Sequence, residues 1–246
     1  MEERISATIP IARSLSYIRN VRVMPIEVLD TIIWINAFLS LFAIVFLFIT
    51  FRRNTTSIKW FAFGLIITWI PIPISYSLLN AGINPNYANS AFYTVAPLFY
   101  MPFFYYEIKR PALKPWFFAI AIGQVAFGFI NVLFIQKETI NSYSSISFNL
   151  IVIVSSLAYY YSLLQGDFRQ NVVRIPVFWL ITGLFIQCSG QLMMISFTSY
   201  LMNVRHDNLM LLWVFHHGLS LATEAVNMYG AFLHFRQLQS PGHSVG

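Results

Sequence analysis

The sequence predicts an all-α, polytopic membrane protein folded as a compact bundle of seven transmembrane helices. Composition is the first observation that predicts it: 57% of the 246 residues are hydrophobic and only 10% are charged, whereas charged residues make up about a quarter of a typical soluble domain. So little polar surface cannot cover a globule in water, and we expect a lipid bilayer around the protein. The second observation is a series of seven apolar segments, each long enough to cross about 30 Å of hydrocarbon.

The seven predicted spans follow one another closely along the chain. They cover residues 31–51, 60–79, 88–106, 115–135, 144–164, 175–201 and 209–235. Connections of roughly six to eleven residues leave no room for a soluble domain, so neighbouring helices should be antiparallel. We expect one transmembrane domain, 27–237, between an N-terminal tail, 1–26, and a C-terminal tail, 238–246. Paired prolines, Pro71 with Pro73 and Pro97 with Pro102, predict kinks in the second and third spans.

The basic residues predict the orientation of the bundle. Those in the connections after the first, third and fifth spans and in the C-terminal tail are Arg52, Arg53, Lys59, Lys109, Arg110, Lys114, Arg169, Arg174 and Arg236. The other connections carry only Lys137 and Arg205. By the positive-inside rule we expect a multi-pass protein of the cell inner membrane, with its N-terminus outside and its C-terminus in the cytoplasm.

The first 23 residues oppose this orientation. Arg4, Arg13, Arg19 and Arg22 would all lie outside, and the segment lacks the apolar region of a signal peptide. We therefore expect either that Met24 is the natural start or that residues 1–23 form a disordered or interfacial tail.

Several functional classes find no support in the sequence. A single cysteine, Cys188, excludes an intramolecular disulfide and a CxxC motif. The net charge of +6 comes from basic residues dotted between apolar segments, so we expect no nucleic-acid partner. The adjacent His216 and His217 point about 100° apart on a helix, which argues against a shared metal ion. We expect no cofactor, and no Gly-rich phosphate loop, GxSxG or HExxH motif is present.

The seventh span has one polar face, and this face is the clearest functional signal. At 100° per residue, six polar side chains fall with His217 within about 120° of arc, and they are His216, Ser220, Thr223, Glu224, Asn227 and His234. An ionised Glu224 near the middle of the membrane costs several kcal/mol, so we expect it to be paired or protonated. It is either a polar contact between helices or part of a ligand, ion or proton site.

Two other spans add candidates. Gln187 and Gln191 share a stripe with Gly183 and Gly190 on the sixth span, and Tyr93 and Tyr100 share a face of the third. These residues serve either helix packing or a site. The predicted ligand-binding residues are Glu224, His217, Ser220, Asn227, His216, Gln187, Gln191, Tyr93 and Tyr100, with no catalytic or metal-binding residue among them.

Several short motifs carry a family resemblance. They are Tyr93-Thr94, Pro176-x-Phe178-Trp179-x-x-x-Gly183 continuing to Gly190, Trp213-x-x-His216, and Asn227-x-Tyr229. Over residues 24–237 the chain resembles a group of stand-alone seven-helix inner-membrane proteins of Bacteroidota. Members often have Glu where this chain has Pro97, and usually Asn where it has Gln191. If that Glu is functional in the group, its role here is lost or moved, for example to Glu224.

Three functional interpretations stay open. The favoured one is a receptor-like or sensor protein that is not an enzyme, binds a small ligand within the bundle and signals to a cytoplasmic protein. The second is a small-solute or proton-coupled transporter that uses Glu224 as its titrating group. The third is a metal-dependent membrane hydrolase built on His216, His217 and Glu224. A further alternative is a structural subunit or assembly factor, in which the polar stripes are only contact surfaces between proteins or helices.

Overall fold

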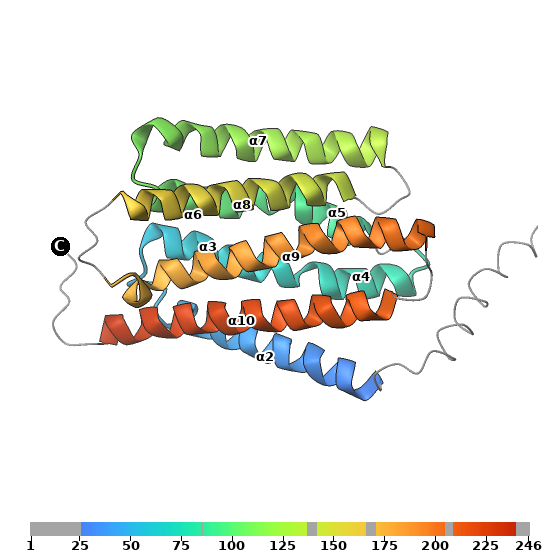
Figure 1. Ribbon diagram of the computed structural model, residues 1–246, viewed down its shortest axis with the longest axis horizontal. Helices are drawn as coiled ribbons and strands as arrows, with labels where there is room; N and C mark the ends of the chain where they lie inside the picture. Colours follow the sequence, from blue (N-terminus) through green and yellow to red (C-terminus); the bar gives the residue numbers. More distant parts are fainter. Residues whose placement is uncertain (1–25, 85, 137–141, 166–170, 205–208, 240–246) are drawn as a thin grey trace, which may run out of the picture.

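The computed structural model describes residues 26–84, 86–136, 142–165, 171–204 and 209–239. All regular secondary structure in this part of the chain is helical, and the helices lie side by side in one bundle (Figure 1). The predicted all-α bundle is therefore confirmed. The proposed start at Met24 and the tail before it lie outside the described residues.

The helices match the predicted spans closely. In chain order they are α2 (Ile26–Ile49), α3 (Thr56–Trp69), α4 (Pro71–Asn80), α5 (Asn86–Val95), α6 (Pro97–Glu107), α7 (Lys114–Ile130), α8 (Ser142–Leu164), α9 (Pro176–Val204) and α10 (Leu209–Gln239). Three short turns of helix accompany them: η1 (Pro111–Leu113), the π-helical turn η2 (Asn131–Ile135) and η3 (Val172–Arg174). The second and third spans each consist of two helices, and α10 continues about one turn beyond the predicted end.

The breaks in the second and third spans fall at prolines. Pro71 begins α4 and Pro97 begins α6, each directly after a residue with helical backbone angles. Because proline has no backbone N–H and its ring crowds the preceding turn, the helix ladder is interrupted at both points. Pro73 lies in the first turn of α4 and Pro102 lies inside α6 without ending it. The interruption predicted for these spans thus occurs at the first proline of each pair.

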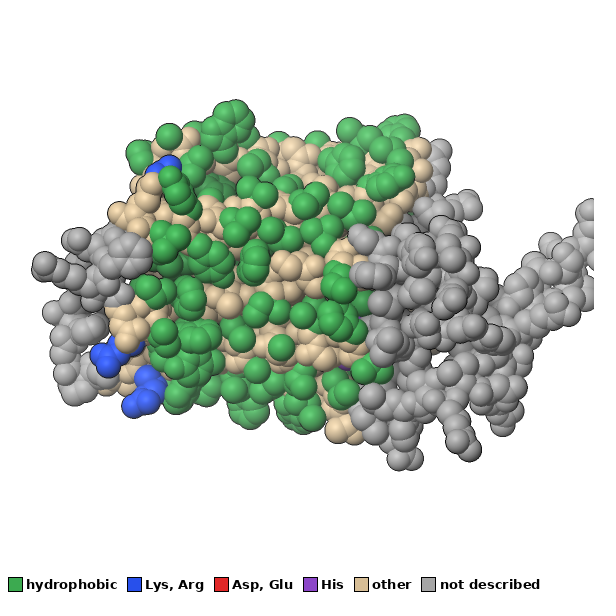
Figure 2. Space-filling view, in the orientation of Figure 1, with side chains coloured by type: hydrophobic (Ala, Val, Ile, Leu, Met, Phe, Trp, Pro, Cys, Tyr) green, Lys and Arg blue, Asp and Glu red, His purple; other side chains and the backbone are tan. Residues whose placement is uncertain are grey.

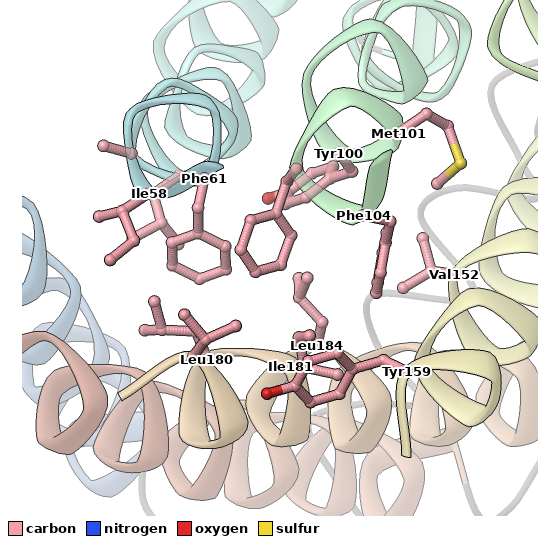
Figure 3. Close-up of a cluster of buried hydrophobic side chains, with 14 of the residues drawn as sticks. Ile58, Phe61, Tyr100, Met101, Phe104, Val152, Tyr159, Leu180, Ile181 and Leu184 are labelled. Atoms are coloured by element: carbon pink, nitrogen blue, oxygen red, sulfur yellow. The ribbon is translucent and has the colours of Figure 1, made fainter. Parts of the chain in front are cut away.

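The helices pack as a ring in chain order. Each helix contacts the next, and α10 closes the ring by packing against both α9 and α2 (Figure 1). Helix α8 also contacts α5 and α6, which places the third span toward the middle of the bundle. Figure 3 shows the buried cluster that fills one part of the interior, where Phe61 of α3, Phe104 of α6 and Ile181 of α9 meet.

The outer surface of the bundle is apolar. Trp34, Ile122 and Phe134 have 65%, 67% and 72% of their surface exposed, and hydrophobic side chains cover most of the face drawn in Figure 2. A water-soluble protein would rarely expose so continuous an apolar surface. Five helical segments of the described chain are long and apolar enough to cross a membrane. The protein is therefore a multi-pass membrane protein surrounded by lipid.

The described basic side chains gather at one end of the bundle. Arg52 and Arg53 follow α2, Lys109 and Arg110 follow α6, and Arg236 lies in the last turn of α10. These segments all end at the same side of the bundle, where Figure 2 shows Lys and Arg side chains. We call this the basic end.

Candidate functional site

A cavity of about 280 Å³ lies among the helices. Its lining residues come from the first half of α2, the junction of α3 and α4, helices α5, α6 and α8, the middle of α9, and α10 between residues 216 and 227. The cavity therefore occupies the half of the bundle away from the basic end. The polar lining residues are Asn36, Thr68, Gln187, Gln191, His216, His217, Ser220, Thr223, Glu224 and Asn227. The others are Ile33, Leu65, Trp69, Ile72, Phe92, Tyr100, Phe148, Leu184 and Cys188.

Eight of the nine predicted ligand-binding residues line this cavity. The exception is Tyr93, whose hydroxyl instead bonds with the side chain of Ser145 on α8. The ring of Tyr93 packs against Phe148, with ring centroids 5.9 Å apart. Tyr93 therefore supports one wall of the cavity from behind. Whether the other eight residues bind a ligand stays a prediction.

Glu224 lies at the centre of the polar wall and is half-buried. The polar side chains that face its carboxyl group are Ser40 of α2 and Asn227, one turn further along α10. Its Oε2 atom is buried and has no hydrogen-bond partner among the described residues. The hydroxyl of Ser40 in turn accepts a hydrogen bond from Trp69 Nε1 at 2.6 Å. The carboxyl group therefore lies beside a hydroxyl that is held in place by an indole.

The aromatic wall of the cavity is also fixed by specific contacts. Tyr100 is buried, and its hydroxyl lies 3.0 Å from Thr68 Oγ1. Its ring packs against Phe148 at a centroid distance of 6.0 Å. The ring reaches this position because Gly64 of α3 has no side chain there: a Cβ atom at residue 64 would come within 2.8 Å of Tyr100 Cε1. Phe92 completes the wall, 6.1 Å from Phe148 between centroids.

Small residues bring α9 and α10 together along the polar wall. A Cβ atom at Gly183 would overlap Asn227 Oδ1, and one at Gly190 would overlap the side chain of Leu219. Stripes of small residues permit this kind of close approach between membrane helices. The glycine stripe of the sixth span therefore serves packing, and it positions Gln187 and Gln191 beside the polar face of α10.

Asn36, Ser40 and Trp69 were not among the predicted site residues. Asn36 lines the cavity and its Nδ2 donates to the backbone carbonyl of His217 at 3.4 Å. A signal for two of them was present: Asn36 and Ser40 are buried polar residues one turn apart within an apolar span, a spacing that places both on one helix face. Trp69 carries no such signal, because it lies in the middle of the predicted span 60–79, where an aromatic residue among apolar neighbours is ordinary.

Other polar residues of the spans make contacts away from the cavity. Gln124 of α7 donates through Nε2 to Ser147 Oγ at 2.8 Å and to the Ser144 carbonyl at 3.1 Å. His234, on the polar face of α10, is buried near the basic end and its Nε2 lies 3.0 Å from Asn54 Oδ1. The polar face of α10 thus has two parts: residues 216–227 line the cavity, and His234 makes the separate contact with Asn54.

Neither metal chemistry nor similarity to known proteins identifies the site further. Among the described residues no three His, Cys, Asp or Glu side chains come together as metal ligands would. No protein-family model, curated protein or solved structure matches the chain. The resemblance to the Bacteroidota group stays a prediction, and the chemistry of the cavity carries the argument from here.

Proposed function

We propose that this protein is a receptor-like integral membrane protein that binds a small ligand within its helical bundle and passes a conformational change to a cytoplasmic partner. The cavity is the observation that carries the proposal. One wall is polar and comes mainly from α9 and α10, and the other is aromatic and comes from α3, α5, α6 and α8. Concave sites with a few convergent polar groups and an apolar remainder are typical of small-molecule binding.

The size of the cavity limits the ligand. Sites for drug-sized ligands measure about 300–1,000 Å³, and this cavity measures about 280 Å³. Its lining residues Ile33, Thr68 and Ile72 are exposed, which indicates that the cavity reaches the surface near α2 and the junction of α3 and α4. A ligand smaller than most drugs therefore has both a volume to fill and a route of entry.

Helix α10 supports the second half of the proposal, transmission to the cytoplasm. It lines the cavity at residues 216–227 and contacts the turn after α2 at its other end, through His234 and Asn54. The Nδ2 atom of Asn54 also donates to the Leu47 carbonyl at 2.8 Å, so the contact involves the end of α2 as well. A ligand that altered the packing of α10 would act on the α2–α3 turn through these bonds.

The basic residues support an orientation with the N-terminus outside, in the cell inner membrane. In that orientation the cavity faces the outer half of the bilayer, and the contact between His234 and Asn54 lies near the cytoplasm. The protein would then take its ligand from outside and present its output inside, where the short connections require a separate signalling protein.

Ligand-dependent thermal stability tests the proposal, because a molecule that binds only the folded state raises the unfolding temperature. The purified protein is screened in detergent against a broad panel of small metabolites. In the variant Ser220→Phe a large ring fills part of the cavity, and in the control Ala222→Phe the same ring is added to an exposed position of the same helix. Both variants are first checked for an unfolding transition without ligand.

We expect the stabilising ligand to act on the wild type and on Ala222→Phe but not on Ser220→Phe. We also expect a cytoplasmic protein to co-purify after cross-linking in membranes. If Ser220→Phe responds like the wild type, the ligand binds elsewhere. If no metabolite stabilises the protein and no partner co-purifies, the receptor proposal is wrong.

A further inference from the structure

Five residues that line the cavity have a buried side-chain oxygen with no hydrogen-bond partner among the described residues, and these are four carbonyl or carboxylate acceptors (Asn36, Gln187, Glu224 and Asn227) and the hydroxyl of Thr223. Three of these acceptors are Glu224 Oε2, Gln187 Oε1 and Asn36 Oδ1. The amide orientation of Asn36 follows from its Nδ2, which donates to the His217 carbonyl. Buried polar atoms in folded proteins nearly always have partners. No described side chain donates to these three oxygens, so a bound molecule with N–H groups would satisfy them.

No Lys or Arg of the described residues lines the cavity beside Glu224, and the two histidines of the lining, His216 and His217, are not among the groups that face its carboxyl. Ser40 and Asn227, which face the carboxyl group, are uncharged. Within a bilayer the attraction between opposite charges is far stronger than in water, and an unpaired charge is correspondingly costly. A positive charge on the ligand would remove this cost.

We propose that the ligand is a small organic cation with N–H donors, and that its ammonium group binds between the Glu224 carboxylate and the amide oxygens of Gln187 and Asn36. This inference rests on the proposed function and names the ligand class of the same cavity. A cationic donor satisfies the three oxygens and the charge at once. An anion would meet a carboxylate with no Lys or Arg beside it among the described lining residues, and a neutral ligand would leave the carboxylate without a counter-charge.

The remaining walls fit the hydrocarbon part of such a cation. Trp69 is fixed by its 2.6 Å hydrogen bond to Ser40, the same hydroxyl that faces Glu224. The indole of Trp69 therefore has a fixed place in the cavity wall, beside the residue that faces the carboxyl group. Phe92, Phe148 and Leu184 line the cavity as well. They would bury an apolar or aromatic group, so the best ligands should be amphipathic primary amines.

The test compares three matched series of small molecules: primary amines, the alcohols of the same skeleton and the corresponding carboxylic acids. Each series contains a butyl, a phenylethyl and an indolylethyl member. Binding to the purified full-length protein is measured at pH 7 by calorimetry and by the shift in unfolding temperature. The variant Glu224→Gln removes the charge and keeps the size. The control Glu107→Gln makes the same change in a half-buried carboxylate that bonds with Ser57, far from the cavity.

We expect the amines to bind the wild type and Glu107→Gln more tightly than the alcohols, and the acids not to bind. Loss of one partner of a buried charge pair costs about 2–5 kcal/mol, so Glu224→Gln should weaken amine binding by at least about thirtyfold. Alcohol binding should change much less. Equal binding of alcohols and amines, or full amine binding by Glu224→Gln, would overturn the cation assignment and leave the receptor proposal standing. The cation assignment also fails if no amine binds, and the metabolite screen with Ser220→Phe then decides the proposed function separately.

Discussion

At the scale of single residues, Gly183 determines how α9 meets the polar wall of the cavity. Position 183 has no space for a Cβ atom, because Asn227 Oδ1 occupies it. Asn227 also faces the carboxyl group of Glu224, so a side chain at position 183 would move a neighbour of the central acidic residue. The same chemical change elsewhere meets no obstacle: a Cβ atom at Gly123 of α7 has nothing within 4 Å.

The pair Gly183→Ala and Gly123→Ala tests this difference. Adding a methyl group to a filled contact typically costs about 1–3 kcal/mol, so we expect Gly183→Ala to lower the unfolding temperature by several degrees in detergent. At an open helical position alanine is favoured over glycine by about 1 kcal/mol, so Gly123→Ala should be neutral or slightly stabilising. Equal unfolding temperatures for the two variants would show that α9 and α10 do not pack this closely.

Tyr93 shows where prediction from residue spacing stopped. Tyr93 and Tyr100 are two turns apart and would share a face of an unbroken helix. The chain breaks at Pro97 between them, so they belong to α5 and α6. Tyr100 reaches Thr68 of α3, whereas Tyr93 bonds with Ser145 of α8. The prolines predicted the break, but the change of direction across it depends on how both halves pack.

At the scale of elements, periodicity predicted more of α10 than of any other helix. A polar face on an otherwise apolar span must turn inward, away from lipid, and Thr223, Asn227 and His234 are indeed buried. The helices that would meet this face could not be read from the sequence. The packing of α2 against α10 brings Asn36 and Ser40 to this face. The hydrophobic periodicity of a single span shows which face is polar, but it does not show which other helices pack against that face.

Helices α7 and α8 are joined by hydrogen bonds that could equally have belonged to a site. Gln124 is buried and donates to Ser147 Oγ, and neither residue lines the cavity. Hydrogen bonds between membrane helices contribute about 0.6 kcal/mol on average and about 1.7 at most. The contact is therefore one of helix packing and should have a measurable but modest energy.

A double-mutant cycle of Gln124→Leu and Ser147→Ala measures that energy. We expect each single variant to lower the free energy of unfolding and the double variant to lose less than the sum, with a coupling of about 0.5–1.5 kcal/mol. The free energies are measured in bicelles by a reversible method. A coupling near zero would contradict the contact. Ligand binding to the cavity should be the same in all three variants.

At the scale of the whole molecule, the chain has two unlike ends and an apolar middle. The described basic side chains lie at one end, and the cavity lies in the other half. An odd number of spans places the start of α2 and the end of α10 at opposite ends of the bundle (Figure 1). The cavity and the contact between His234 and Asn54 are thus separated along the length of the bundle, as the proposed receptor function requires.

Orientation in the membrane is the prediction on which this separation depends. Two cysteine variants test it: Ile83→Cys, between α4 and α5, and Lys109→Cys, between α6 and α7, both at exposed positions at opposite ends of the bundle. The native Cys188 is only 3% exposed, so the wild type supplies a low background. With a membrane-impermeant thiol reagent on spheroplasts, we expect Ile83→Cys to be labelled and Lys109→Cys to be labelled only after the membrane is opened. The reverse pattern would mean that the positive-inside rule fails for this chain. The cavity would then lie in the cytoplasmic half of the membrane, and a ligand from outside the cell would be excluded.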